Sequence, residues 1–462
     1  MGTTTEHPVV VIGAGPTGLA AAAHLLERGL DPLVLEAGDG PGAAIAQWGH
    51  VRLFSPWRYC LDTASRPLLD GAGGWEVPDL DALPTGADLV HDYLEPLAAT
   101  PALRDRIRYG VRVTAVVRDG ADRTRSLGRE RRAYRVRTRR SDGGTRDVLA
   151  RAVIDASGTW TRPNPVGAHG IPAVGESDAG AYLTGPLPDV LGAERDRFAG
   201  RHTLVVGMGH SAANTLLALV TLAGQVPGTR VTWAVRGGSA RRLFGGGTDD
   251  ALPARGLLGS RLREAVDAGR LELVTRAAVD ELVPDGDVVH VRGSGRRDGV
   301  DGPLDLAVHQ VVGATGFRPD LDMLREVRLD LDPVVEAPVR LAPLIDPNLH
   351  SCGTVEPHGE SVLRHPDAGF YLAGMKSYGR APTFLLATGY EQVRSIAAAL
   401  AGDRAAADTV RLELPATGVC STDLGGDGGG GGGGGDGADG AACCGTTAEP
   451  GPQPVELTLA PR

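Results

Sequence analysis

The sequence predicts an α/β fold made of two three-layer units, each built on a parallel sheet. Two observations lead to this prediction. A short apolar run, a glycine-rich turn and an Ala/Leu-rich helix follow one another at residues 9–27, and the same pattern recurs at residues 203–223. A continuous apolar run that feeds a helix through a turn is typical of a central strand in a parallel sheet. The two copies therefore indicate two Rossmann-like dinucleotide-binding domains.

Length and charge narrow the class of protein. A chain of 462 residues suits two or three domains, and 42% hydrophobic with 23% charged residues is a globular composition. The formal net charge of −10 disfavours a nucleic-acid partner, which needs a clustered basic face. Arginines do crowd residues 118–146, but Asp and Glu interrupt them, which is typical of a solvated hairpin.

Targeting and cysteine content point to a cytoplasmic protein. The sequence has no run of eighteen apolar residues, so we expect no membrane span. The amino-terminal residues lack the basic and apolar regions of a signal peptide. Five scattered cysteines are too few for a disulfide framework. We expect reduced thiols and no metal site, and the oligomeric state stays open.

The first glycine turn follows the apolar run 9–12 and consists of Gly13, Ala14, Gly15, Pro16, Thr17 and Gly18. In such a turn the first glycine permits a tight bend, the second lets the backbone approach a pyrophosphate, and the third lets helix and strand pack closely. The helix amino terminus then offers unpaired N–H groups to the phosphates. A second predicted strand, 32–35, ends in Glu36, whose carboxylate can accept hydrogen bonds from ribose hydroxyls. The alternative is an incidental strand–turn–helix.

The second glycine turn follows the run 203–206 and consists of Gly207, Met208, Gly209, His210, Ser211 and Ala212. Alanine in place of the third glycine is a permitted variant. The next predicted strand, 230–235, ends in Arg236 rather than an acid. Because an arginine can pair with a 2′-phosphate that a carboxylate would repel, this turn favours NADPH over NADH. Arg241 and Arg242 compete for that role, and ordinary surface charge is the alternative.

Two nucleotide sites in one chain imply two nucleotides, and a bound flavin beside an exchangeable nicotinamide is the usual pairing. We therefore expect FAD at the first turn and NADPH at the second. Strand–turn units at 152–158 and 309–316 mark crossings between the domains. They predict a discontinuous FAD domain with an NADPH domain inserted into it, followed by a disordered Gly-rich tail. The predicted segments are 1–165, 166–304, 305–423 and the tail 424–462.

Two segments, VIDASGTWTRPN (153–164) and RFAGRHTLVVGMGHSA (197–212), resemble the flavin-containing monooxygenase branch of the two-dinucleotide-binding-domain flavoprotein superfamily. The resemblance covers residues 1–420. It implies a C4a-(hydro)peroxyflavin that delivers one oxygen atom from O2 to a small soft nucleophile. The paired redox cysteines of the superfamily's disulfide reductases are absent, and we expect Cys60 and Cys352 to be buried small groups.

The segments WGHVRLFSPW (48–57), GMKSYGRAPTFLLATGYEQ (374–392) and LPATGVC (414–420) resemble the flavin-binding monooxygenases encoded in actinobacterial arsenic-resistance operons. That resemblance implies a role in arsenic resistance. In the tail, Cys443 and Cys444 are adjacent, and their thiolates would suit trivalent arsenic, with Cys420 as a third sulfur. The alternative is that the cysteine pair is a chance extension of the terminus.

The stretch 48–57 directly follows the first predicted strands, so we expect it near the isoalloxazine ring. It supplies four candidate catalytic residues: His50, Arg52, Ser55 and Trp57. A hydrogen-bond donor beside the flavin would steer its oxygen chemistry. Ordinary packing is the alternative for His50 and Trp57.

A carboxyl-terminal segment completes the predicted flavin site with Gly374, Thr383 and Phe384. Thr383 is expected to open a helix over 384–400 whose amino terminus stabilises negative charge on the reduced flavin. Where the superfamily often places an aspartate on the ribityl chain, this sequence has Met375 and Lys376.

Two other functions are also consistent with the sequence. One is an NADPH-dependent reductase or oxidase that inserts no oxygen. The other is a flavin-bearing sensor whose tail recruits a partner.

Overall fold

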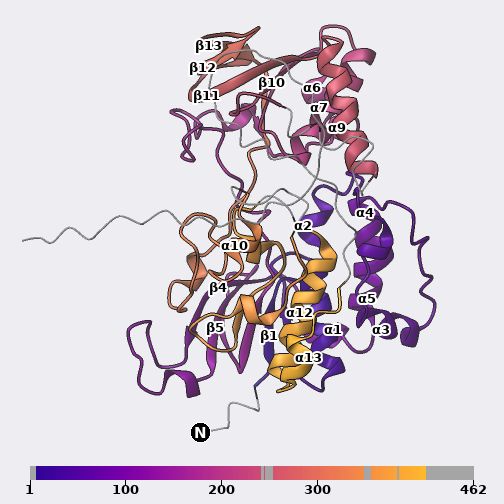
Figure 1. Ribbon diagram of the computed structural model, residues 1–462, viewed down its shortest axis with the longest axis vertical. Coiled ribbons are helices and arrows are strands. Elements are labelled where there is room, and N and C mark those ends of the chain that lie inside the picture. Colours follow the sequence, from indigo (N-terminus) through magenta and orange to yellow (C-terminus); the bar gives the residue numbers. More distant parts are fainter. Residues whose placement is uncertain (1–6, 241–243, 245–252, 348–354, 382–383, 413–462) are drawn as a thin grey trace, which may run out of the picture. The chain divides into compact units, whose positions relative to one another are not determined.

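The computed structural model describes residues 7–240, 244, 253–347, 355–381 and 384–412. All of them belong to the first of two units, Met1–Thr422. The tail predicted at 424–462 lies outside the described residues. Figure 1 traces the chain from the amino terminus through the helices and strands.

The first sheet has five strands in the order β15-β7-β1-β2-β3, and every neighbouring pair is parallel. β1 at its centre is a run of β-branched residues, whose restricted side-chain rotamers favour extended backbone. β1 and β2 begin and end where the sequence predicted. The strands are β1 (Val9–Ile12), β2 (Pro32–Leu35), β3 (Ile107–Arg108), β7 (Ala152–Asp155) and β15 (Phe370–Leu372).

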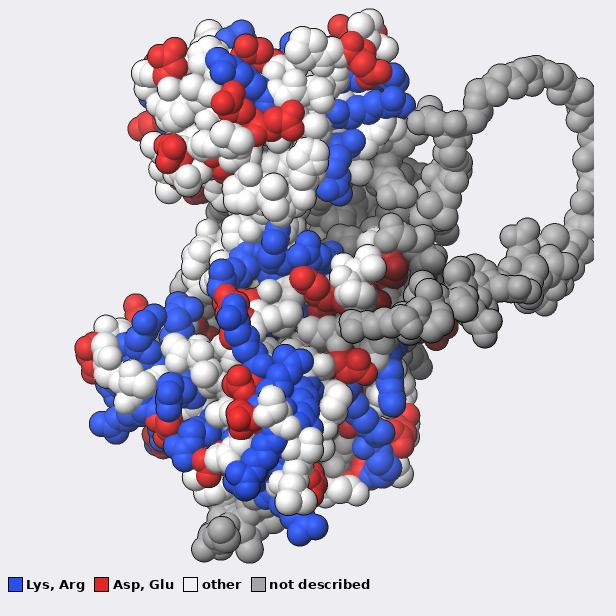
Figure 2. Space-filling model, turned by 90° about the vertical axis from the view of Figure 1, so that its left-hand side faces the viewer, with Lys and Arg blue, Asp and Glu red and all other residues white. Residues whose placement is uncertain are grey.

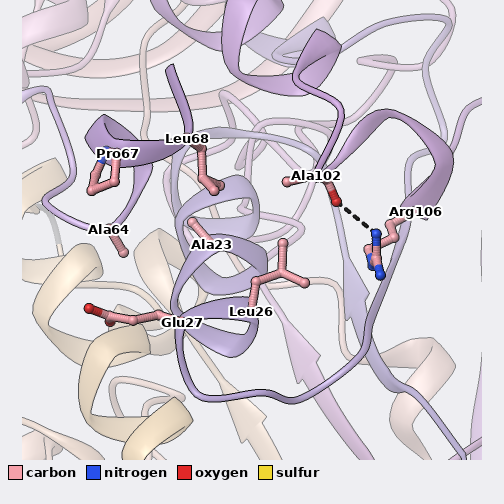
Figure 3. Close-up of a pocket in the computed structure, with 8 residues that line it drawn as sticks. All are labelled: Ala23, Leu26, Glu27, Ala64, Pro67, Leu68, Ala102 and Arg106. Carbon is pink, nitrogen blue, oxygen red and sulfur yellow. Dashed lines mark hydrogen bonds between the residues drawn. The ribbon is translucent and has the colours of Figure 1, made fainter. Parts of the chain in front are cut away.

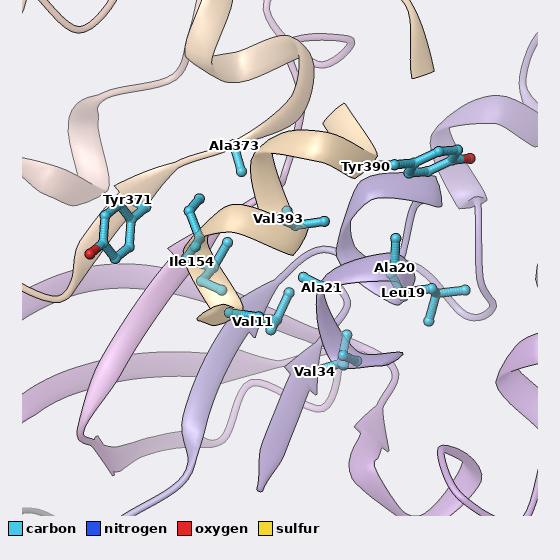
Figure 4. Packing of buried hydrophobic residues seen from close by; sticks show 14 of the residues in the cluster. Val11, Leu19, Ala20, Ala21, Val34, Ile154, Tyr371, Ala373, Tyr390 and Val393 are labelled. Atoms are coloured by element: carbon cyan, nitrogen blue, oxygen red, sulfur yellow. The ribbon is translucent and has the colours of Figure 1, made fainter. Parts of the chain in front are cut away.

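Alternate side chains of β1 serve two cores on opposite faces of this sheet, as the two-residue period of a strand requires. Val9 and Val11 pack against helices α1 and α12, as Figure 4 shows for Val11. Val10 and Ile12 face a second, antiparallel sheet of three strands. The layers are therefore helices, parallel sheet and antiparallel sheet. The covering elements are α1 (Pro16–Glu27), α12 (Leu386–Leu400), β4 (Val111–Arg118), β5 (Tyr134–Arg140) and β6 (Thr145–Ala150).

The second sheet has seven strands in the order β13-β12-β11-β10-β9-β14-β8. Its members from β11 to β8 are parallel, whereas β11, β12 and β13 form an antiparallel meander. Helix α7 covers one face, so both sheets confirm the predicted α/β class. The elements are β8 (Leu183–Thr184), β9 (His202–Val206), β10 (Arg230–Ala234), β11 (Glu272–Asp285), β12 (Val288–Arg297), β13 (Val300–Val308), β14 (Gln310–Gly313) and α7 (His210–Gln225).

The predicted boundary between residues 304 and 305 is wrong. Strand β13 runs across it, and β14 pairs with β9 in parallel register, with Gly313 opposite Val206. The segment from 305 to 313 thus completes the second sheet, because β14 fills the free hydrogen-bonding edge of β9. The chain leaves the second sheet only after Gly313.

Two segments connect the sheets and are bonded to each other. The amide nitrogen of Asn164 donates to the Gly316 carbonyl at 2.9 Å, and its side-chain amide donates to the Thr315 carbonyl at 3.1 Å. The Thr315 hydroxyl donates to the Asn164 carbonyl at 2.7 Å. The Arg318 guanidinium closes the junction by donating to Asn164 Oδ1 at 2.8 Å. The outgoing and returning chains therefore cross as a short antiparallel ladder.

The remaining helices are short, apart from α9, which contributes to the core beside the second sheet. None of the described helices has both the length and the apolar content of a membrane span. They are α2 (Ala43–Ala46), α3 (Ser65–Ala72), α4 (Gly86–Leu89), α5 (Glu95–Ala99), α6 (Arg195–Phe198), α9 (Pro253–Asp267), α10 (Ala342–Ile345), α11 (Glu360–Leu363) and α13 (Arg404–Asp408).

The arginine-rich segment 118–146 forms much of the antiparallel sheet and carries paired charges. Arg135 donates to Asp119 at 2.6 Å and to Asp147 at 3.0 Å, and Arg137 donates to Asp147 at 2.9 Å. Figure 2 shows basic side chains interspersed with acidic ones over this part of the molecule. The segment is thus an antiparallel hairpin with paired surface charges, as the sequence predicted.

Stability should fall on mild acidification because of His365. This imidazole is buried, its Nε2 atom lacks a hydrogen-bond partner within the described structure, and burial lowers its pKa from 6.5 to about 4. An unfolded histidine therefore binds a proton before the folded one does, so the free energy of unfolding decreases as pH falls from 6.5 towards 4. The slope contributed is at most about 1.4 kcal/mol per pH unit. His365→Gln should flatten the dependence of the thermal midpoint on pH over this range, and an unchanged slope would contradict the assignment.

Candidate functional site

The first glycine turn lies at the carboxyl edge of the first sheet. β1 lies between β2 and β7, so the strand order reverses beside β1. Ligands of open α/β sheets bind outside the carboxyl ends of the strands at such a reversal. The first glycine turn follows β1 there, and residues 156–158 follow β7 in register with it, because Ile12 lies opposite Asp155.

The three glycines of the first turn differ in what a side chain at each position would meet. Gly13 has φ +99°, and a Cβ there would lie 2.9 Å from the Ala156 carbonyl oxygen. A Cβ on Gly18 would lie 1.9 Å from the Gly13 carbonyl oxygen, so helix α1 could not pack against the turn. A Cβ on Gly15 would meet no atom within 4 Å. The first and third glycines are therefore required by the fold, and the second leaves open space.

That open space lies where the sequence predicts a pyrophosphate. Gly15 is the N-cap of α1, Pro16 is in the first turn of the helix, and no side chain caps it. Backbone N–H groups at such an end attract anions through hydrogen bonding and the helix dipole. Pro16, Thr17 and Gly18 are buried beneath the turn. Their roles in holding a cofactor stay predictions, and the structure shows open space beside an uncapped helix amino terminus.

Glu36 is fixed beside the same turn. Its Oε2 atom accepts from the Ala14 N–H at 2.6 Å, and its Oε1 atom accepts from the Gly38 N–H at 2.7 Å. Each carboxylate oxygen can accept a second hydrogen bond. The carboxylate is thus held by two backbone N–H groups, and its contact with ribose hydroxyls stays a prediction.

The carboxyl-terminal segment meets the first turn through Gly374. This residue has φ +66°, and a Cβ on it would lie 2.8 Å from Thr17 Oγ1. Its N–H donates to Gln392 of α12 at 2.8 Å. Phe384 lies close by, with its ring 5.1 Å from that of Tyr378. The helix expected over 384–400 begins two residues later, at Leu386, and Thr383 lies outside the described residues.

The second glycine turn repeats the geometry of the first. Gly207 has φ +133°, and a Cβ there would lie 2.0 Å from the Ala314 carbonyl oxygen. A Cβ on Gly209 would meet no atom within 4 Å, and Gly209 is the uncapped N-cap of α7. Ala212 is fully buried in place of the third glycine. His210 and Ser211 open the helix and are partly exposed. A second open, uncapped helix amino terminus therefore lies at the carboxyl edge of the second sheet, where the sequence predicts NADPH.

Arg236 is exposed just beyond the carboxyl end of β10, where the sequence predicted a partner for a 2′-phosphate. A second exposed arginine lies next to it. Arg276 has φ +49° at an irregularity in β11, and its N–H donates to the Gly237 carbonyl at 2.9 Å. A positive φ is uncommon outside glycine, so the sequence gives no sign of the irregularity in β11. The position of Arg276 beside Gly237 could therefore not be predicted. Arg241 and Arg242 lie outside the described residues.

The four candidate catalytic residues have different surroundings. His50 is exposed, and Arg52 donates to the Leu83 carbonyl at 2.6 Å. The Ser55 carbonyl accepts from the thiol of Cys60 at 3.6 Å. Trp57 is 4% exposed and belongs to the main core. Trp57 therefore packs in the core, which was the alternative to a catalytic role. The catalytic roles of His50, Arg52 and Ser55 stay predictions.

The segment also touches the second glycine turn. The ring of Phe54 lies 5.1 Å from the ring of His210. This contact links the stretch 48–57 to the turn predicted to bind NADPH. Phe54 was not among the candidates, because nothing in its sequence neighbours distinguishes it from a core phenylalanine.

A buried ion pair at the first edge was also missed. Lys376 and Asp155 are fully buried, and Lys376 Nζ lies 2.7 Å from Asp155 Oδ2. The ammonium also donates to the Ser157 hydroxyl at 3.0 Å. Where the resemblance led us to look for an aspartate on the ribityl chain, the structure places a lysine that reaches the end of the neighbouring strand.

The cysteine in the described part of the chain, Cys60, has a free and buried thiol. Burial raises the pKa of the Cys60 thiol to about 12, which keeps it protonated at neutral pH. Cys60 is fully buried in the main core, as expected from the sequence. Cys352, Cys420, Cys443 and Cys444 lie outside the described residues.

A pocket of about 440 Å³ opens elsewhere on the first unit of the fold (Figure 3). It borders the carboxyl-terminal half of α1 through Ala23, Leu26 and Glu27. The glycine turn lies at the other end of this 12-residue helix, roughly 15 Å away at 1.5 Å per residue. This pocket is separate from the predicted cofactor site.

Comparison with known proteins agrees with the first glycine turn. Residues 8–76 match the protein-family model DAO, FAD dependent oxidoreductase. The indole-3-pyruvate monooxygenase YUCCA1 of Oryza sativa subsp. japonica is 31% identical over 219 residues, which is 46% of this chain and 44% of that protein. The chain spans less than half the length of the curated relatives that it matches.

Solved structures match over much more of the chain. Bacillithiol disulfide reductase Bdr (YpdA) from Bacillus cereus has a TM-score of 0.63 at 21% identity, covering 86% of this chain and 99% of that one. DfoA, the cadaverine monooxygenase of desferrioxamine biosynthesis in Erwinia amylovora, solved with FAD, has a TM-score of 0.59 at 15% identity, covering 90% and 99%. At these identities the likeness shows the fold. The chain therefore shares the fold of these two structures, and its residues 8–76 match the FAD-dependent oxidoreductase family.

Proposed function

We propose that this protein is an NADPH- and FAD-dependent monooxygenase that oxygenates a small soft nucleophile. In this proposal FAD binds at the first glycine turn with Glu36, and NADPH binds at the second turn with Arg236. The FAD domain comprises residues 1–165 and the chain after Gly313, and the NADPH domain lies between them. FAD, when bound, would accept hydride from NADPH and react with O2.

One observation carries the proposal. Both Gly15 and Gly209 leave open space at the uncapped amino terminus of a helix, at the carboxyl edges of two separate parallel sheets. A dehydrogenase with one cofactor needs one such cradle, whereas hydride transfer from a nicotinamide to a flavin needs two. The duplication supports a flavoprotein that is reduced by a second nucleotide.

Two observations favour oxygenation over disulfide reduction. Cys60, within the described chain, is a buried thiol rather than a paired redox cysteine. The plant relative at 31% identity is named a monooxygenase, and so is the FAD-bound structural neighbour from Erwinia amylovora. A reductase or oxidase without oxygen insertion, and a sensor that scarcely turns over, are the rival functions.

The stoichiometry of turnover separates these rivals. NADPH and O2 consumption and peroxide release are measured with thioether, sulfide and amine probes. A monooxygenase consumes NADPH faster with one of these probes, forms its oxygenated product and releases less peroxide than the NADPH consumed. Peroxide equal to NADPH with every probe would indicate an oxidase, and negligible NADPH consumption would indicate a sensor.

Arg236→Ala should narrow the preference for NADPH over NADH. A charge-assisted hydrogen bond to the 2′-phosphate contributes roughly 1.5–3 kcal/mol, so we expect the ratio of kcat/KM values to fall at least about tenfold. Most of the change should lie in the NADPH value. An unchanged ratio would move the role to Arg276, Arg241 or Arg242, and Arg276→Ala is the matched variant.

We also propose, from the sequence alone, a role in arsenic resistance in which Cys443 and Cys444 bind arsenic. Thiolates are soft ligands that suit trivalent arsenic. NADPH oxidation is compared with and without arsenite in the full chain, in Cys443→Ser/Cys444→Ser and in a truncation after Thr422. A response that the two variants lose supports capture of arsenic by the tail. Equal responses remove the tail from the reaction, and the absence of any response to arsenite or an organic arsenical removes arsenic as the substrate.

A further inference from the structure

The Lys376–Asp155 pair is a fully buried charge pair that the proposed function does not use. Besides the 2.7 Å contact between the two charged groups, the Ser157 side chain bridges them. Ser157 Oγ accepts from the ammonium at 3.0 Å and donates to Asp155 Oδ1 at 2.7 Å. The Ser157 N–H donates to the same oxygen at 3.1 Å. Both carboxylate oxygens are therefore held, and Lys376 uses two of its three N–H bonds.

The pair lies at the edge where we place the flavin. Asp155 ends β7 opposite Ile12, directly before the first glycine turn. The carbonyl of the next residue, Ala156, is the atom that a Cβ on Gly13 would strike at 2.9 Å. Lys376 reaches this point from the segment Gly374–Tyr378, which follows β15. The ion pair thus joins the segment after β15 to the end of β7. Both lie on one side of the first glycine turn, and Glu36, after β2, lies on the other side.

Stability alone gives little reason for such a pair. The cost of removing two charges from water often exceeds their mutual attraction, and an apolar pair of similar volume is frequently as stable. In a buried site, however, each charge acts strongly on a neighbouring group, because water does not screen it. A fixed charge pair beside a cofactor that changes its own charge can therefore control that change.

We propose that Lys376 and Asp155 are positioning residues that set the charge balance felt by FAD and hence its reduction potential. The inference rests on FAD binding at the first glycine turn. Reduction adds two electrons to the flavin ring, and deprotonated reduced flavin is an anion. The Lys376 ammonium stabilises that anion, the Asp155 carboxylate opposes it, and Ser157 holds both in place.

The charge of each residue can be removed while its hydrogen bonds are largely kept. Lys376→Gln leaves the Asp155 carboxylate unbalanced, so reduced FAD should bind more weakly relative to oxidised FAD. Asp155→Asn leaves the ammonium unbalanced, so reduced FAD should bind more tightly. We expect the ratio of the two dissociation constants to change at least about tenfold in opposite directions, which corresponds to about 30 mV each way for a two-electron couple.

The measurement is the midpoint potential of the FAD-loaded protein, titrated anaerobically against a reference dye, with the Kd of oxidised FAD from fluorescence. Lys376→Arg retains the charge, so its ratio of dissociation constants for reduced and oxidised FAD should stay within about twofold of the wild-type value. The double variant Lys376→Gln/Asp155→Asn should return towards wild type. Arg129→Met is the matched control, because it breaks a buried pair with Asp367 of the same 2.7 Å length elsewhere. It should lower the thermal midpoint and leave the potential unchanged.

Opposite shifts in the two single variants support the proposal, because a merely structural pair would move both variants in one direction. Shifts of the same sign, or potentials equal to wild type, would overturn it. If Lys376→Gln does not retain FAD, Asp155→Asn decides alone, since only a rise in potential agrees with the proposal. Wild-type protein that binds no FAD would instead contradict the proposed function.

Discussion

Gly15→Val is expected to abolish FAD binding and leave the apoprotein folded. Gly15 has φ −78° and ψ −176°, an extended conformation that valine adopts readily. A Cβ there would meet no atom within 4 Å, so the fold accommodates the new side chain without strain. The same side chain would occupy the space through which a pyrophosphate reaches the N–H groups of α1.

The expected loss is large. Charge-assisted hydrogen bonds from backbone N–H groups contribute roughly 1.5–3 kcal/mol each, so losing two of them weakens FAD binding at least about 100-fold. The checks are the FAD content of the purified protein and the thermal midpoint of the apoprotein. Full FAD retention in Gly15→Val would place the flavin elsewhere. A lower midpoint without FAD loss would show a structural role.

Gly209→Val is expected to weaken NADPH binding, as Gly15→Val is expected to weaken FAD binding. Gly209 also has extended backbone, φ −96° and ψ 179°, and open space at its Cβ position. We expect Gly209→Val to keep its flavin and to bind NADPH at least about 100-fold more weakly, because the same phosphate contacts are lost. The Kd of NADPH is measured on the FAD-loaded protein.

The two valine variants control for each other. Each changes the same residue type in the same backbone conformation at equivalent ends of two helices. Exchange of the two losses, with Gly15→Val losing NADPH and Gly209→Val losing FAD, would reverse the assignment of the domains. Loss of both cofactors in either variant would indicate that the cradles are not independent.

The parts of the fold that depend on local sequence were predictable. Strand β1 is a run of four apolar residues followed by glycines at fixed spacing, and such a pattern has few alternatives. The same holds for β9 and the second glycine turn. Glu36 was predictable too, because its position at the end of β2 follows from strand length alone.

The errors arise where local patterns do not distinguish two partners. Strand β14 is a short apolar run that suits either sheet equally well, so the sequence could not show that it pairs with β9. Trp57 was a candidate because a tryptophan near a flavin can be functional, but its burial depends on distant residues of the main core. The start of α12 at Leu386 was misplaced by two residues, which is a usual uncertainty at helix ends.

Lys376 shows what a sequence pattern cannot reveal. Its partner Asp155 lies 221 residues away in the chain. A lone lysine after a strand is normally an exposed charge, and only the folding of β15 beside β7 brings the two residues together. Arg276 was missed for a similar reason, since its place beside Gly237 depends on an irregular strand.

Anaerobic reduction of the bound flavin by NADPH tests the central claim most directly, because it needs no oxygenation substrate. Wild-type protein loaded with FAD is mixed with one equivalent of NADPH, and the loss of the oxidised flavin's visible absorption is followed in time. Two sites in one chain predict rapid bleaching in the wild type and slow bleaching in Gly209→Val, with dithionite bleaching both equally. Equal rates of bleaching by NADPH in the two proteins, or a wild-type flavin that NADPH does not reduce, would contradict the account.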